Sequence, residues 1–430
     1  MEKIDPYSKA GQELQEEENM NIAQAKEEIK HTVQAYLKKD TEGNYRIPSV
    51  RQRPILMIGQ PGIGKTQIME QIAEECKVGL VSYTITHHTR QSAVGLPMIT
   101  QETYEGKTYS VTEYTMSEII ASVYRCMRDE GEKEGILFID EINCVSETLT
   151  PAMLQFLQCK TFGNRAVPQG WIIVAAGNPP EYNKSVRDFD MVTLDRVRSI
   201  EVDADLDIWL NYAAEKHIHG VILSYLQLRK KNFYRIETDV DGLRFVTARG
   251  WEDLSVLMQM YEELKIPVTE DVIGEYLRLP EVAEDFYAYY ELYRKYRDDY
   301  GIREILRGQA QPAMFERLMK ADFDERISVV NLLLDALKEP LCELFETKCF
   351  TGTPQSDTLS AAMTHAFEFL EDAFGTEGSQ EMLLFVTGLT MCKEAAVFLA
   401  MNPQPKYMKY NELLLGGGRR QKLLQEIKTS

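Results

Sequence analysis

The chain has 430 residues, of which 44% are hydrophobic, so it is long enough for two or three domains with packed cores. Its 67 acidic and 48 basic residues give a formal net charge of −19, which argues against nucleic acid as a partner because phosphates would be repelled on average. The N-terminus lacks a signal-peptide pattern, no apolar run is long enough for a membrane span, and the seven cysteines include no CxxC pair, so we expect a cytoplasmic protein with reduced thiols.

Short apolar runs alternate with helical patterns in the first half of the chain. A polar lead-in at 1–20 precedes a helical pattern at 21–38, and a second helix is expected at 66–76. Because continuous apolar strands separated by helices form parallel sheets covered on both faces, this half predicts an α/β domain. The five predicted strands are 54–59, 79–83, 136–140, 171–176 and 199–202.

An insertion and two helical regions complete the predicted architecture. Between the second and third strands, residues 98–115 alternate in polarity and turn at Glu105-Gly106, which predicts a β-hairpin. Strand patterns fade after residue 205 and helical patterns take over. We therefore expect an α/β domain over 21–205, an all-α lid over 206–300 and a helical C-terminal extension over 301–430.

The first predicted strand leads into a glycine-rich loop with the pattern G-x-x-x-x-G-K-T. Glycines let backbone N–H groups turn inward toward phosphate oxygens, and the following helix adds the positive end of its dipole. The lysine of this pattern reaches the β- and γ-phosphates, and the threonine hydroxyl ligates Mg²⁺. The predicted ATP-binding residues are Gly59, Gln60, Pro61, Gly62, Ile63, Gly64, Lys65, Thr66 and Gln67.

The third and fourth predicted strands end in polar residues. Asp140 emerges where ligands sit in open parallel sheets, so we expect it to hold Mg²⁺ together with Thr66. Glu141 beside it is the candidate to orient and deprotonate an attacking water. Asn178 is the candidate to hydrogen-bond that water or the γ-phosphate, although in isolation it would be interpreted as a turn residue before proline.

Arginines supply the remaining candidates. Arg196 stands before the fifth predicted strand, where an exposed arginine can enter a neighbouring subunit's site and stabilise transition-state charge. The alternative for Arg196 is a surface ion pair such as that with Asp195, and Arg198 and Arg187 are less favoured candidates for the same role. Arg249 falls in the first turn of a predicted helix capped by Thr247, where a cation opposes the helix dipole. This local conflict indicates another duty for Arg249, such as contact with the γ-phosphate.

In this order the five elements resemble the AAA+ ATPases, and within them the MoxR-like branch. By that resemblance GQPGIGKT is Walker A, ILFIDE is Walker B, and the hairpin is similar to the helix-2 insert of this branch. Asn178 resembles sensor 1, Arg196 the arginine finger and Arg249 sensor 2. Family members often carry Phe after the finger arginine, but Val197 stands here and Arg198 follows, so either arginine can be the finger.

The resemblance covers about residues 20–290 and implies a function for the whole. It implies an AAA+ P-loop core, ATP hydrolysis with Mg²⁺, and a ring, with a hexamer expected. It also implies a chaperone-like remodeller that acts on a protein client or with a von Willebrand factor A domain partner, which residues 301–430 could bind. Two alternatives stay open: a nucleic-acid-directed motor or restriction-type NTPase, against which the net charge argues, and a nucleotide-gated assembly switch, against which Glu141 argues.

Overall fold

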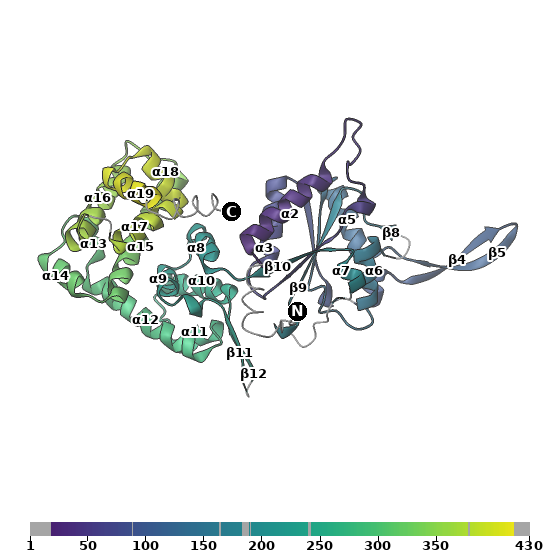
Figure 1. Cartoon of the computed structure of the whole chain (residues 1–430), viewed down its shortest axis with the longest axis horizontal. Coiled ribbons are helices and arrows are strands. Elements are labelled where there is room, and N and C mark those ends of the chain that lie inside the picture. The colour runs from purple at the N-terminus through teal and green to yellow at the C-terminus, as the bar shows by residue number, and fades with distance from the viewer. Residues whose placement is uncertain are drawn as a thin grey trace, which may run out of the picture. The chain divides into compact units, whose positions relative to one another are not determined.

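The computed structural model describes residues 19–87, 89–162, 165–182, 189, 191–239, 242–376 and 379–416. The chain divides into two compact units, which we call the first unit, up to Ile208, and the second unit, from Trp209 (Figure 1). The first unit holds the predicted α/β domain, and the second unit is mainly helical.

A six-stranded parallel sheet forms the centre of the first unit, as the apolar runs predicted. The strand order across the sheet is β1-β10-β2-β9-β6-β3. The edge strand β1 has only two residues, too few to show a periodicity in the sequence. The strands are β1 (Met20–Asn21), β2 (Ile55–Gly59), β3 (Gly79–Thr84), β6 (Gly135–Asp140), β9 (Trp171–Gly177) and β10 (Arg198–Asp203).

Helices cover both faces of this sheet, which explains why its middle strands are apolar throughout rather than alternating (Figure 1). α5 (Glu118–Asp129) and α6 (Thr150–Cys159) pack on the face that carries Leu137. α2 (Ile22–Leu37) and α3 (Lys65–Cys76) lie on the other side. The first unit also contains α4 (Arg90–Val94), α7 (Met191–Leu194) and the short pair β7 (Thr161–Phe162) and β8 (Arg165–Ala166).

The predicted hairpin insert is confirmed and projects from the body of the first unit (Figure 1). It consists of β4 (Pro97–Tyr104) and β5 (Lys107–Tyr114), paired antiparallel along their whole length. The turn residues Glu105 and Gly106 have φ angles of 50° and 77°. Positive φ at both positions matches the twist of the strands, so a two-residue turn closes the hairpin at the predicted place.

Helices build the second unit around α15 (Phe323–Thr347), a 25-residue helix whose side chains Val329, Val330 and Leu333 are fully buried. It contacts α9 (Gly220–Leu228), α16 (Pro354–Phe374) and α17 (Gln380–Met391), among others. The helices are α8 (Leu206–Glu215), which crosses the boundary between the units, then α9 (Gly220–Leu228), α10 (Ala248–Leu264), α11 (Glu270–Tyr276), α12 (Pro280–Asp299), α13 (Ile302–Leu306), α14 (Pro312–Lys320), α15 (Phe323–Thr347), α16 (Pro354–Phe374), α17 (Gln380–Met391), α18 (Lys393–Met401) and α19 (Pro405–Gly416).

The expectation of an all-α lid needs a correction. Within 206–300 the chain forms an antiparallel pair, β11 (Arg235–Asp239) and β12 (Gly242–Val246). Ile236 pairs with Phe245, so apolar side chains meet across the two strands. Five-residue strands with charged residues between the apolar ones are easily taken for helical segments. Asp239 pairs with Gly242, and the alternation of apolar and polar residues on both sides of this pair is the hairpin pattern that was overlooked.

No single helix in the described part of the chain has the length and apolar composition to cross a membrane. α17 and α18 meet that test only together, and they are bent by 93° at their junction. Their side chains Phe385 and Phe398 are fully buried in the second unit.

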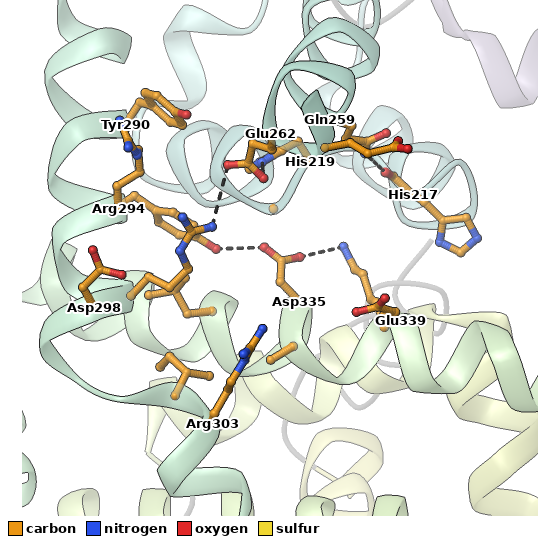
Figure 2. Close-up of a pocket in the computed structure, with 18 of the residues that line it drawn as sticks. His217, His219, Gln259, Glu262, Tyr290, Arg294, Asp298, Arg303, Asp335 and Glu339 are labelled. Carbon is orange, nitrogen blue, oxygen red and sulfur yellow. Dashed lines mark hydrogen bonds and ion pairs between the residues drawn. The ribbon is translucent and has the colours of Figure 1, made fainter. Parts of the chain in front are cut away.

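An open cavity of about 1380 Å³ lies in the second unit (Figure 2). Its wall contains paired charges of both signs. Asp335 accepts hydrogen bonds from the Tyr293 hydroxyl at 2.9 Å and from Lys338 Nζ at 3.0 Å. Across the cavity, His219 contacts Glu262 at 3.3 Å, and this contact lowers the pKa of the Glu262 carboxyl. The Tyr293–Asp335 hydrogen bond therefore joins α12 to α15, and the His219–Glu262 contact joins the N-cap of α9 to α10.

Candidate nucleotide-binding site

The glycine-rich loop joins β2 to α3 with a backbone that requires its glycines. Gly62 and Gly64 have φ angles of 76° and 94°, which side-chain-bearing residues rarely adopt. A Cβ on Gly59 would lie 2.7 Å from the Val202 carbonyl oxygen, so β10 approaches the loop too closely for any larger residue. Gly64 is the N-cap of α3, and the first N–H groups of that helix therefore open toward the loop.

The other predicted loop residues lie between β2 and the first turn of α3. The Gln60 side chain accepts a hydrogen bond from the Ala204 N–H at 3.2 Å, which fixes the loop to the end of β10. Ile63 is buried beneath the loop, while Pro61 is half-buried and Gln67 is exposed on α3. The loop is thus held by the burial of Ile63 and by the hydrogen bond of Gln60.

Lys65 connects the loop to the neighbouring strand end. It is buried, and its Nζ donates to the carbonyl oxygens of Gly59 at 2.6 Å and Gln60 at 2.8 Å. Its third bond, at 2.9 Å, goes to Oδ1 of Asn178, the residue that follows β9. Because β9 lies between β2 and β6 in the sheet, Asn178 stands between the loop and the end of β6.

Thr66 and Asp140 form the second connection across the site. The Thr66 hydroxyl donates to Asp140 Oδ2 at 3.0 Å, and Asp140 Oδ1 accepts from the Glu141 N–H at 2.9 Å. Hydroxyl and carboxylate oxygens are the ligands that Mg²⁺ prefers, and here one of each lies at hydrogen-bond distance beside the loop. The donor set therefore fits the ion that the sequence implies.

Glu141 has an unusual backbone for a glutamate. Its φ of 58° lies in the left-handed region, where a non-glycine residue is held only by its surroundings. The next residue, Ile142, donates its N–H to the Ala176 carbonyl of β9 at 2.9 Å, and Cys144 donates back to the Glu141 carbonyl at 2.9 Å. These bonds hold a tight turn that leaves the Glu141 side chain partly exposed at the edge of the sheet.

The structure adds Asn143, which the sequence analysis missed. Its side chain contacts the backbone of Asn178, 35 residues later in the chain. The spacing Asp-Glu-x-Asn was visible, but an asparagine after a strand is more often a turn residue, and nothing in the spacing tells which strand it reaches.

The candidate finger arginines differ in their surroundings. Arg196 is exposed, and its guanidinium donates to the Gln158 side chain. Arg198 opens β10 and is held against α2, where it forms an ion pair with Glu28 and donates to the Thr32 hydroxyl at 2.5 Å. Arg198 thus has two partners on α2, and Arg196 stays at the surface.

The remaining two arginines lie elsewhere. Arg187 falls outside the described residues. Arg249 is exposed in the second unit, in the first turn of α10. The predicted N-cap is confirmed, because the Thr247 hydroxyl accepts the Gly250 N–H at 3.2 Å. The contact of Arg249 with a γ-phosphate stays a prediction.

The comparison with known families agrees with this geometry. Residues 54–197, about a third of the chain, match the family model of the AAA domain, dynein-related subfamily. A search of curated proteins found no similar sequence. The matched segment contains the loop, the end of β6 and the end of β9. The match and the geometry together support an AAA+ ATPase domain with a P-loop core in the first unit.

Proposed function

We propose that the protein is an ATP-hydrolysing AAA+ machine of the MoxR-like branch, which works as a ring and remodels protein complexes. One observation carries the proposal: the loop and two strand ends are joined in one network at the edge of the sheet. Lys65 donates a hydrogen bond to Asn178 at 2.9 Å, and Thr66 donates one to Asp140 at 3.0 Å. This network supports a site with phosphate cradle, metal ligands, base and water-orienting amide, the parts that hydrolysis of a triphosphate needs.

In this proposal each group has a separate task. The loop N–H groups and Lys65 bind the phosphates of ATP. Thr66 and Asp140 hold Mg²⁺, which neutralises phosphate charge when bound. Glu141 accepts the proton of the attacking water, and Asn178 orients that water. Because a phosphate oxygen is a stronger partner for an ammonium group than an amide oxygen, ATP replaces Asn178 on Lys65 and frees the amide for this task.

The ring is proposed because the first unit offers an arginine and an apolar surface next to each other. Arg196 is exposed two residues after α7, whose side chains Met191, Val192 and Leu194 are 86%, 54% and 43% exposed. Adjacent exposed apolar side chains mark contact surfaces on soluble proteins. A second copy of the chain covers them in this proposal and receives Arg196 in its own site, and the resemblance favours six copies.

The client is proposed to be protein. The hairpin insert exposes Ile99, Tyr104 and Tyr109 at 81%, 53% and 50%, a surface suited to apolar protein segments. The net charge of −19 is unfavourable for a nucleic-acid client. The resemblance adds a partner with a von Willebrand factor A domain.

Phosphate release measured against protein concentration tests this proposal. A shared site predicts that the specific activity rises as the chains assemble, with size-exclusion chromatography showing the ring at the same concentrations. Nucleotide-driven assembly without phosphate release would instead identify an assembly switch. Stimulation by DNA or RNA that weakens steeply with salt would identify a nucleic-acid motor. To find the client, the Glu141→Gln variant is purified with ATP from its host and its bound proteins are identified.

A further inference from the structure

The turn after β6 does more than carry Glu141. With φ of 58° at Glu141, the chain bends back over the end of β9, where Ile142 donates its N–H to the Ala176 carbonyl at 2.9 Å. This bend brings the next residue, Asn143, against the residue that follows β9. The side chain of Asn143 is enclosed there, with an exposed fraction of 6%.

Asn143 pairs with both backbone groups of Asn178. Its Nδ2 donates to the Asn178 carbonyl oxygen at 2.8 Å, and its Oδ1 accepts the Asn178 N–H at 3.2 Å. The residue before Asn178 leaves room for this pair only because it is glycine: a Cβ on Gly177 would lie 2.6 Å from Asn143 Oδ1. The backbone of Asn178 is therefore fixed by a side chain and not by the sheet.

This pair links the two groups that act on water in the proposed reaction. The Asn178 side chain accepts a hydrogen bond from Lys65 Nζ at 2.9 Å. The orientation of this side chain depends on the Asn178 backbone, which Asn143 holds in place. Glu141 lies two residues before Asn143 on the same turn, which the Cys144-to-Glu141 bond of 2.9 Å closes. One turn thus sets the position of the candidate base and of the candidate water-orienting amide relative to each other.

We propose that Asn143 is a positioning residue of the hydrolytic site, which acts through Asn178 and holds its amide at a fixed spacing from Glu141. The inference rests on the proposed ATPase activity. A displacement of about 1 Å in such a group lowers turnover about 100-fold, so Asn143→Ala should lower kcat by about 10- to 100-fold. The affinity for ATP should change less than about threefold, because the loop and Thr66 are untouched.

A matched control separates positioning from stability. Asn331 is equally buried, in the second unit, with its Nδ2 donating to the Ile327 carbonyl at 3.0 Å. Asn331→Ala should lower the melting temperature as Asn143→Ala does, but leave kcat unchanged where both variants are folded. Gly177→Ala should lower kcat by pushing Asn143 away, and its effect should largely vanish in the Asn143→Ala background, because both substitutions act through one contact.

The Asn143→Asp variant gives the most specific readout. Its ionised carboxylate still accepts the Asn178 N–H but opposes the Asn178 carbonyl, whereas the protonated acid donates to that carbonyl as the amide does. The ratio of its kcat to that of the wild type should therefore rise about tenfold or more as the pH falls from about 8 to about 5. A purely structural role gives a flat ratio.

Three outcomes decide the inference. Reduced kcat with retained ATP binding in Asn143→Ala, together with acid rescue of Asn143→Asp, supports it. Wild-type kcat in Asn143→Ala, or a flat ratio for Asn143→Asp, overturns it while the ATPase proposal stands. Absence of phosphate release by the assembled wild type overturns the ATPase proposal itself, and the inference with it.

Discussion

Arg196→Ala should remove most ATP turnover and leave the fold intact. The Arg196 side chain and its hydrogen bond to Gln158 are exposed to solvent, so the loss of this bond should cost at most about 1 kcal/mol of unfolding free energy. An arginine supplied by a neighbour raises kcat by about 10³-fold or more, which corresponds to about 4 kcal/mol of transition-state stabilisation. Turnover should thus fall far more than stability.

Arg198→Ala is the matched control for this prediction, because the sequence left both arginines as candidates. Removing Arg198 breaks the ion pair with Glu28 and the 2.5 Å bond to Thr32. These contacts are partly exposed, so the unfolding free energy should fall by about 1 kcal/mol while kcat changes less than about threefold. Both variants should therefore stay within about 1 kcal/mol of the wild type in a melting experiment, while only Arg196→Ala should lose phosphate release.

Mixing variants tests whether the arginine acts between subunits. Lys65→Ala damages its own phosphate site but keeps Arg196, and Arg196→Ala keeps its own site. In a ring assembled from equal amounts of the two, about a quarter of the sites have an intact loop and receive an intact arginine, so about a quarter of wild-type turnover should return. If the mixture is no more active than the two variants measured separately, Arg196 does not act in trans.

Three further predictions address the loop, the half-buried Lys160 and the hairpin. Gly64→Ala and Gly131→Ala should each lower the unfolding free energy by about 1–2 kcal/mol, because the φ angles of the two glycines are 94° and 78°. Only Gly64→Ala should abolish ATP binding in a titration, and equal ATP binding by both variants would refute the role of the loop. Burial lowers the pKa of Lys160 to about 8, so its destabilising charge is fully present below pH 8 and is lost as the pH rises toward the ordinary value of 10.5. The unfolding free energy of the wild type minus that of Lys160→Met should consequently rise by about 1–2 kcal/mol over that pH range in denaturant titrations, and a constant difference would contradict the assignment. Ile99→Asn should change the melting temperature little, since 81% of Ile99 is exposed, while client-stimulated turnover falls and basal turnover does not; unchanged stimulation would exclude Ile99 from client contact.

The central sheet could be predicted because strands that are buried on both faces appear in the sequence as continuous apolar runs. The strands β2, β6 and β9 are apolar at nearly every position, and Gly106 of the hairpin turn is the residue type that a φ of 77° favours. The β11–β12 pair was not predicted because its apolar residues are few and lie among charged residues. The edge strand β1 was not predicted because two residues are too few to show an alternation of apolar and polar positions.

The site was predictable where one short motif carries the chemistry and not where two distant segments meet. The loop and the two acids at the end of β6 could be named from their spacing alone. The contact between Asn143 and Asn178 depends on the parallel register of β6 with β9 and on the left-handed turn at Glu141, and neither is visible in the residue types. The difference between Arg196 and Arg198 likewise depends on α2, far away in the sequence.

The central claim is that Glu141 activates water for ATP hydrolysis at the glycine-rich loop, and one variant tests it directly. Glu141→Gln keeps the size of the side chain and removes its basicity, so ATP binding and ring assembly should be retained while phosphate release falls by about 100-fold or more. Both quantities are measured on the same preparation, binding by titration and turnover by phosphate release. Wild-type turnover in Glu141→Gln would contradict the account.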